Sequence, residues 1–320
     1  MHKLLSELLE LTEEERRILE TRREVEKNIY TSQVNFVIEG ERFLRNNKMI
    51  EARKHTRFTH FPKHRHDYIE LNYVLNGKFI QKVGDDRLHL QKGELLFLNQ
   101  HIYHEIEPSE HEDIIINFII NPHFFESMFG YLSSDSNISH FLINSLFDHT
   151  QSGQYLYFQI AEVEEIQRLL ERLLIEIMNP SLLSESSIKL CTALLLIELI
   201  RHSDKLQQPF DNPLNHYIVV ETMKYIDEHY QDATLNELAK YLKRPNYALS
   251  KQIKQATSAT FKELLQEKRL ERARELLIKT ELPITEIAEM VGYDNISYFY
   301  RIFRNKYQMT PKQFKVKKRT

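Results

Sequence analysis

One local pattern occurs twice in this chain: LAKYLKRPNYALSKQIK at residues 238–254 and IAEMVGYDNISYFYRIFR at residues 287–304. From Leu249 onward the two copies match at a constant offset of fifty residues, so that Leu249 corresponds to Phe299. Apolar residues fall on apolar ones and basic residues on basic ones. The repetition predicts two copies of one small structural unit.

Each copy carries the local signals of a helix, a tight turn and a second helix. Thr234 followed by Glu237 is typical of a capping box, in which the two residues satisfy each other's free backbone N–H groups. Gly292 can adopt the left-handed conformation that ends a helix, and Asp294 is then expected to cap the next helix. Both copies are therefore predicted to be helix-turn-helix units.

This region resembles the signature of the AraC/XylS transcription regulators. The residues that carry the resemblance are Lys268, Ile287-Ala288, Val291-Gly292-Tyr293, Ser297-Tyr298-Phe299, Phe303-Arg304 and Met309-Thr310-Pro311. The resemblance implies an all-α, DNA-binding domain at 214–320 with two helix-turn-helix units. Ile296 departs from the family pattern, which usually has a polar residue there. The alternative is a helical bundle whose repeats only pack on each other.

The resemblance also assigns the residues that would contact double-stranded DNA. Base-reading positions fall on Tyr247, Ser250 and Lys251 in the first copy, and on Ile296, Ser297, Tyr300 and Arg301 in the second. Asn295 is a further groove-facing candidate. Lys254 and Arg304 would hold phosphates, which fix the register of the protein on the duplex without specifying sequence.

The segment between the copies, from Phe261 to Thr280, is predicted to form one long helix. At 1.5 Å per residue this helix spans about 30 Å, and successive major-groove faces of B-DNA lie roughly 34 Å apart. Such a strut can hold two recognition helices about one turn of duplex apart.

The charge distribution also favours a DNA-binding module at this end of the chain. Residues 213–320 contain 20 Lys and Arg against 13 Asp and Glu, whereas the other 212 residues contain 23 against 33. The formal net charge of −3 therefore combines a basic module with an acidic remainder. Basic side chains beside phosphates release condensed counterions and so supply affinity that is independent of sequence.

Residues 51–150 contain short alternating apolar segments separated by turn residues such as Asn76-Gly77, which predict a small β-barrel. The expected fold class is therefore α+β multidomain. Its parts are a barrel with flanking helices and an all-α double helix-turn-helix domain. Six residues in this range resemble the two motifs of a cupin barrel, the amino-terminal domain of many AraC relatives: His64, His66, Glu70, Gly77, Gly93 and His104.

In cupin enzymes, three histidines and a glutamate at these positions hold a metal. His64 and His66 are two residues apart, so on a strand they point to one face, and Glu70 lies at an even offset as well. With His104 they offer a donor set that suits a divalent transition metal. The same side chains can instead line a metal-free pocket for a small effector such as a sugar, or lie as satisfied polar residues at the barrel mouth. Tyr73 and Tyr103 are candidate pocket aromatics.

Three other segments flank these domains. Residues 151–206 predict two helices, the second so apolar that it must be buried between domains or against another chain, and the resemblance makes this the dimerisation segment. Residues 207–213, with two prolines, are expected to be a linker. Residues 1–50 predict a helical extension that packs on its own domain or, alternatively, binds a partner.

The composition excludes several protein classes. A single cysteine, Cys191, excludes an internal disulfide. The first residues turn acidic at once, unlike a signal peptide, and the longest apolar run is too short to cross a bilayer. We therefore expect a cytoplasmic, bacterial protein that does not act at a membrane.

The expected function is that of a transcription regulator, not an enzyme, controlled by a small effector in the cupin-like domain. It would act as a homodimer and would contact RNA polymerase if it is an activator. Two alternatives are a metal-dependent cupin enzyme tethered to DNA and a regulator controlled by a protein partner. A third, a DNA-repair regulator, needs a reactive acceptor cysteine, and Cys191 in an apolar helix is poorly suited to that role.

Overall fold

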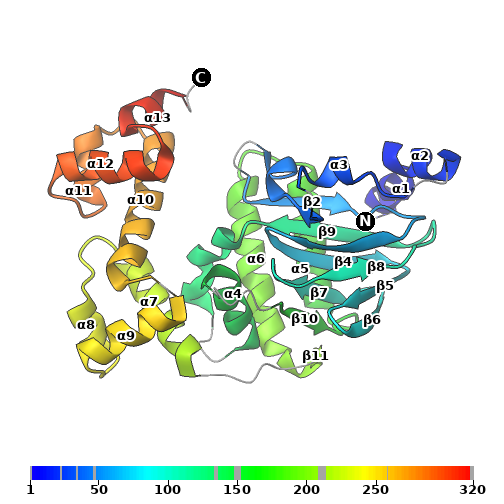
Figure 1. The fold of residues 1–320 in the computed structure, drawn as a ribbon, viewed down its shortest axis with the longest axis horizontal. Helices are drawn as coiled ribbons and strands as arrows, with labels where there is room; N and C mark the ends of the chain where they lie inside the picture. Colours follow the sequence, from blue (N-terminus) through cyan, green and yellow to red (C-terminus); the bar gives the residue numbers. More distant parts are fainter. Residues whose placement is uncertain are drawn as a thin grey trace. The chain divides into compact units, whose positions relative to one another are not determined.

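The computed structural model describes residues 2–21, 24–33, 35–45, 48–132, 136–147, 153–207, 214–257 and 259–317. Its contacts divide the chain into two units, Met1–Pro213 and Leu214–Thr320 (Figure 1). The linker expected at 207–213 lies outside the described residues except for Gln207, which ends a short strand. Among the described residues, no helix has the length and apolar character needed to span a membrane.

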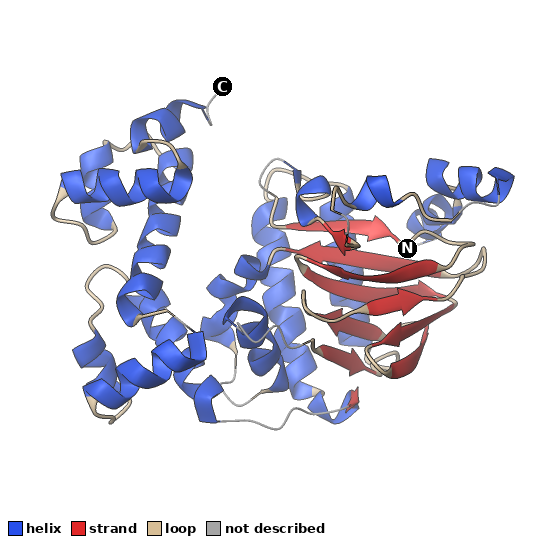
Figure 2. Ribbon diagram, viewed as in Figure 1, coloured by secondary structure: helices blue, strands red, loops and turns tan. Residues whose placement is uncertain are grey.

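Two β-sheets form the body of the first unit (Figure 2). The five-stranded sheet has the order β1-β3-β8-β5-β6, and the six-stranded sheet has the order β11-β10-β7-β4-β9-β2. The strands are β1 (Val37–Ile38), β2 (Ile50–Lys54), β3 (Phe61–His66), β4 (Ile69–Asn76), β5 (Lys78–Val83), β6 (Asp86–Gln91), β7 (Leu95–Leu98), β8 (His104–Ile106), β9 (Ile114–Ile120), β10 (Tyr155–Phe158) and β11 (Leu206–Gln207).

Helices flank these sheets, as the sequence predicts. The α-helices are α1 (His2–Leu9), α2 (Glu13–Thr21), α3 (Lys27–Tyr30), α4 (Asn137–Phe147), α5 (Glu164–Met178) and α6 (Ser184–Arg201). The 3₁₀ segments among the described residues include η1 (Gly40–Arg42), η3 (Pro122–Tyr131) and η4 (Ser203–Lys205). Because α5 packs on the six-stranded sheet, β4 is buried on both faces from Ile69 to Leu75. The expected α+β architecture is confirmed.

The regular structure among the described residues of the second unit is all helical. They are α7 (Leu214–His229), α8 (Leu235–Tyr241), α9 (Asn246–Thr257), α10 (Phe261–Lys279), α11 (Ile284–Met290), α12 (Ile296–Tyr307) and α13 (Pro311–Lys317). The Thr234 hydroxyl caps α8 by accepting from the N–H of Glu237 at 3.2 Å, which is one half of the expected capping box, whereas the Glu237 carboxylate accepts from the hydroxyl of Tyr225. The expected cap of α12 is wrong by one residue, because Asn295, not Asp294, accepts from the N–H of Tyr298.

A buried ion cluster fastens the amino-terminal helices to the barrel. Glu15, at the start of α2, is fully buried and accepts from Nε of Arg57 at 2.7 Å and from Nζ of Lys54 at 2.9 Å. Arg57 is also fully buried and donates to the carbonyl of Leu9 at the end of α1. Burial alone would raise the pKa of Glu15, but hydrogen bonds from Arg57, the backbone of Thr12 and Lys54 lower it to about 2. The extension therefore packs on its own domain.

We expect Glu15→Gln to lower the free energy of unfolding of the first unit by about 3 to 5 kcal/mol at neutral pH, because it leaves Arg57 buried without a counter-charge. The wild type keeps this contribution above the ordinary pKa of 4.5 and loses it as the pH falls toward 2, so the difference should shrink over that window. Urea unfolding of the full chain at several pH values measures it. Glu13→Gln is the control, since Glu13 pairs with Arg17 at the surface, where such a pair contributes under about 1 kcal/mol. Equal effects of the two changes would contradict the assigned role of Glu15.

Candidate functional site

Three buried histidines meet inside the barrel. His64 and His66 lie on β3, and His104 lies on β8, where it pairs directly with His64 across the two strands. Their ring nitrogens lie within 4.8 Å of one another, and Nε2 of His66 is 3.0 Å from Nε2 of His104. The antiparallel register of β3 and β8 thus brings together residues that are far apart in sequence.

Glu70 approaches the same point from the opposite sheet. It lies on β4, and its Oε2 is 3.5 Å from Nε2 of His66 and 4.0 Å from Nε2 of His104. All four side chains are almost completely buried. The structure therefore places the four residues of the cupin-like pattern in one cluster, with Glu70 at the even offset that the sequence indicates.

A chain of side-chain amides fixes the protonation of His104. Asn72 donates to Oδ1 of Asn117 at 3.0 Å, and Gln81 donates to Oδ1 of Asn72 at 3.1 Å. The amide oxygen of Gln81 is then left facing Nδ1 of His104 at 2.8 Å. Because an amide oxygen only accepts, His104 must carry its proton on Nδ1. Its Nε2 therefore carries no proton and accepts the hydrogen bond from Nε2 of His66.

The backbone orients His64 in a similar way. Its Nδ1 lies 2.8 Å from the carbonyl oxygen of Pro62, which can only accept. Nε2 of His64 is therefore also unprotonated. Among the described residues, Nδ1 of His66 and Oε2 of Glu70 are buried without a hydrogen-bond partner. Buried polar atoms in native proteins are nearly always paired, and Oε2 of Glu70, which lies near Nε2 of both His66 and His104, is the atom that an ion or ligand at the centre of the cluster would contact.

Burial keeps the imidazoles neutral. It lowers the pKa of His64 to about 4 and holds the pKa values of His66 and His104 well below the ordinary 6.5, with a further lowering by the neighbouring imidazoles. Burial raises the pKa of Glu70 to about 7, against opposing effects of Asn72 and Arg53. At neutral pH the cluster therefore offers neutral nitrogens and a carboxyl group poised between its two forms.

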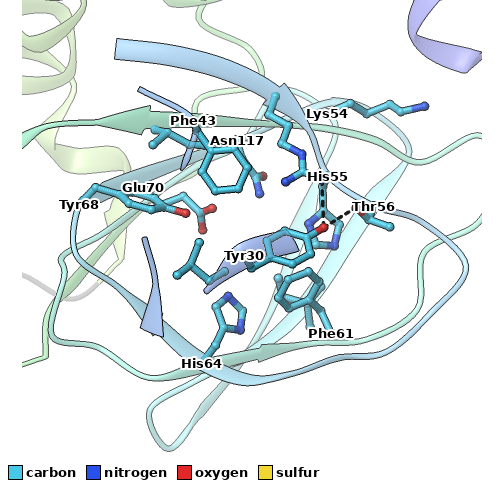
Figure 3. A pocket seen from close by; sticks show the side chains of 14 residues that line it. Tyr30, Phe43, Lys54, His55, Thr56, Phe61, His64, Tyr68, Glu70 and Asn117 are labelled. Atoms are coloured by element: carbon cyan, nitrogen blue, oxygen red, sulfur yellow. Dashed lines mark hydrogen bonds between the residues drawn. The ribbon is translucent and has the colours of Figure 1, made fainter. Parts of the chain in front are cut away.

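A small cavity adjoins this cluster (Figure 3). Tyr30, His64 and Glu70 point into it, and its volume is about 30 Å³. This is room for an ion or a few water molecules, far below the roughly 300 Å³ at which pockets for drug-sized ligands begin. Tyr30 comes from α3, and its hydroxyl contacts Glu14 and Thr56.

Sequence reasoning missed several residues of this cavity. His55 follows β2, is fully buried, and packs its ring against Phe61 and Phe79. Because His55 lies just beyond the end of the strand, the alternation of inward and outward residues along the strand does not predict where its side chain points. Tyr30 lies outside the predicted barrel altogether, so only the packing of the amino-terminal extension brings it here.

The two tyrosines proposed for the pocket do not line it. Tyr73 lies three residues beyond Glu70 on β4, so it faces the opposite side of the sheet, and its hydroxyl donates to Gln167 of α5 at 2.7 Å. Tyr103 immediately precedes His104 and is 44% exposed, with its ring beside the cations of Lys63 and Arg65. Strand alternation separates both from the cluster.

The candidate DNA-contacting residues lie on α9 and α12, the second helices of the two units, or, for Asn295, at the cap of α12. Those that are exposed are Tyr247, Lys251, Lys254, Asn295, Ser297, Arg301 and Arg304. Ser250, Ile296 and Tyr300 are half-buried. The opposite face of α12 packs inward through Phe299, Ile302 and Phe303. The apolar periodicity therefore leaves basic and polar side chains on one accessible side of each helix.

Comparison with known proteins finds a family match for each of the two units. The family model of the AraC-like ligand binding domain matches residues 49–208, half of the chain, and that of a helix-turn-helix domain matches residues 238–317. The HTH-type transcriptional activator RhaS of Escherichia coli is 23% identical over 259 residues, which cover 80% of this chain and 87% of that protein.

Two further similarities each cover about a third of the chain. The xylose operon regulatory protein of Escherichia coli K12 is 35% identical over 102 residues, 30% of this chain and 25% of that protein. The chain thus matches only about a quarter of the length of this relative. The solved carboxyl-terminal domain of AraT, a response regulator from Geobacillus stearothermophilus, is 41% identical over 31% of this chain and 84% of that domain, with a TM-score of 0.30. On the two family matches, the chain belongs to the AraC family of transcription regulators.

Proposed function

We propose that this protein is a sequence-specific, DNA-binding transcription regulator whose barrel binds a small effector. The observation that carries the proposal is the presence of two helix-turn-helix units, each with an accessible polar and basic face on its second helix. Joined to them in the same chain is a barrel with a buried, incompletely satisfied cluster of His64, His66, Glu70 and His104. We infer that it acts by binding and not by turnover.

The strut between the units supports simultaneous reading of two groove segments. Helix α10 has 19 residues and begins with a full capping box formed by Thr260 and Glu263. At 1.5 Å per residue it is about 29 Å long, close to the roughly 34 Å of one duplex turn. Arg301 on α12 is exposed and suits bidentate contact with guanine, whereas Lys254 on α9 suits a phosphate.

For the effector, we favour a divalent transition metal. Ligands about 2.1 Å from an ion lie roughly 3.0 to 3.5 Å from one another, and the separations of 3.0, 3.5 and 4.0 Å among His66, His104 and Glu70 are close to this range. His64 and His104 already present unprotonated Nε2 atoms, and the Gln81 amide orients His104 as outer ligands of metal sites do. These residues would hold the ion, which would act as a signal.

A sugar is the second candidate, because the relatives named above include a xylose operon regulatory protein. A cavity of about 30 Å³ cannot accept a sugar as it stands. Binding would require Tyr30 or another lining side chain to move. This difference in size separates the two candidates.

Three further roles belong to this proposal. We expect the protein to work in the cytoplasm, where bacterial promoters are found. We expect it to act as an activator that contacts RNA polymerase, in line with the name of RhaS.

We also infer a homodimer. Leu183, Leu190 and Leu194 are 69%, 62% and 50% exposed, and their spacing on and just before α6 places them on one face. Large apolar side chains exposed on one helix face are typical of an interaction site.

The DNA-binding residues can be tested by substitution. Arg301→Ala should cost about 1 to 3 kcal/mol on the operator and relax preference at one base position, because a bidentate base contact is lost. Lys254→Ala should weaken operator and unrelated DNA alike and reduce the salt dependence by about one phosphate contact. Binding titrations at several salt concentrations measure both. Arg168→Ala, at an exposed position of α5, is the charge-matched control. Equal losses by Arg301→Ala on specific and unrelated DNA would show that Arg301 does not read a base.

The metal can be tested by titrating chelator-treated full-length protein with Co²⁺ and following its absorption. We expect one ion per chain, and His66→Ala should weaken binding by at least about tenfold, because it removes a central ligand. His89→Ala, on the exposed side of β6, is the matched control and should bind as the wild type does. If the wild type does not bind Co²⁺, the proposal of a metal effector is wrong and an organic effector is favoured.

The dimer can be tested by sedimentation at micromolar concentration. Leu190→Glu should convert a dimer to a monomer, because it places a charge within the apolar stripe. Leu19→Glu, at a comparably exposed leucine of α2, should leave the dimer intact. A wild type that sediments as a monomer would contradict the inference.

A further inference from the structure

Arg269 makes an unusual set of contacts in the middle of α10. Its guanidinium donates from Nε to the carbonyl of Tyr230 at 2.6 Å, from Nη2 to the carbonyl of Gln231 at 2.8 Å, and from Nη1 to the carbonyl of Gly292 at 2.8 Å. All three nitrogens of the planar group are therefore used on backbone oxygens. The guanidinium also lies 5.4 Å from the centre of the Tyr293 ring.

These carbonyls belong to the two different helix-turn-helix units. Tyr230 and Gln231 directly follow α7, which packs against α9. Gly292 lies in the turn between α11 and α12. Arg269 thus ties the end of the first unit's supporting helix to the turn of the second unit. Only a rigid fork with several donors can span three fixed acceptors at once.

The two backbones meet closely at this joint. Gly292 has φ +86°, and a Cβ there would lie 2.3 Å from the carbonyl oxygen of Gln231 and 2.8 Å from Cζ of Arg269. The side-chain amide of Gln231 donates across the joint to the carbonyl of Met290 at 2.9 Å. Glycine is therefore needed both for its backbone conformation and because no side chain fits.

Each recognition helix is connected firmly to this joint. Tyr298 and Tyr307 of α12 donate to Gln266 and to the carbonyl of Leu270 on α10, at 3.2 and 3.3 Å. On the other side, Lys268 of α10 pairs with Asp227 of α7. A change of angle at the joint would therefore move α9 relative to α12.

We propose that Arg269 is a positioning residue that sets the relative orientation of α9 and α12, and through it the spacing of the two half-sites that the protein accepts. The inference rests on the proposed DNA-binding function. One base pair advances the duplex by about 3.4 Å, so a small rotation at the joint shifts one helix off its base edges. Arg269 itself contacts no base and affects DNA binding only through the relative orientation of α9 and α12.

The experiment uses full-length protein and duplexes that the wild type selects from a random-sequence library. Affinity is measured for the selected duplex, for a duplex with one base pair inserted between the half-sites, and for a duplex with one half-site only. The variants are Arg269→Met, which keeps the apolar stem and removes every donor, and Arg269→Lys, which keeps the charge on a single point. Lys279→Met, in the exposed last turn of α10, is the control for lost charge.

For the wild type and the control, we expect the insertion to cost at least about tenfold in affinity. For Arg269→Met, we expect affinity for the selected duplex to fall by about tenfold and the penalty for the insertion to shrink to within about threefold. Binding to the single half-site should stay within about twofold of the wild type. Arg269→Lys should lie between.

A folded Arg269→Met variant that keeps the full penalty for the insertion overturns the role of Arg269. If Arg269→Met does not fold, the same measurement on Arg269→Lys replaces it. A folded Arg269→Lys variant with the full penalty for the insertion then overturns the role of Arg269. A wild type that selects no duplex at all overturns the proposed DNA-binding function itself, so the two failures are distinguishable.

Discussion

Burial of polar side chains inside the barrel is the constraint on which the candidate effector site depends. Burial makes charge costly, so His64, His66 and His104 stay neutral and the pKa of Glu70 rises to about 7. A neutral imidazole carries its proton on one of its two ring nitrogens. For His104, the chain of amide hydrogen bonds from Asn117 to Gln81 fixes the proton on Nδ1. The pairing of β3 with β8 supplies the geometry. Together these features place the unprotonated Nε2 atoms of His64 and His104 in one buried cluster with the carboxyl group of Glu70.

Satisfied charged groups also determine how two other parts of the molecule pack. At the amino-terminal extension, Glu15 is buried because Arg57 and Lys54 satisfy it. In the DNA-binding unit, Arg269 satisfies three carbonyls where two turns meet. In each case a buried or half-buried charge holds together segments that the chain itself leaves far apart. Removing one partner costs more than the pair contributes, which makes these positions informative to substitute.

The sequence predicts those features whose signals are local. The offset of fifty residues reveals the duplicated units, Thr234 and Glu237 mark the start of α8, and even spacing on β3 puts His64 and His66 on one face. The same parity argues against Tyr73, three residues from Glu70, and Tyr103, next to His104. Tyr30, His55 and Arg269 acquire their positions from contacts across long stretches of chain. No pattern along the sequence specifies such contacts, so these residues could be found only in the folded structure.

The central claim is that the barrel holds neutral imidazoles in which Nε2 of His64 and Nε2 of His104 are unprotonated. Nitrogen-15 NMR of the histidine rings in the full-length protein at pH 7 tests it most directly. The account predicts that His104 and His64 carry their protons on Nδ1 and have unprotonated Nε2 atoms. Rings protonated on both nitrogens, or a His104 protonated on Nε2 with a bare Nδ1, would contradict it.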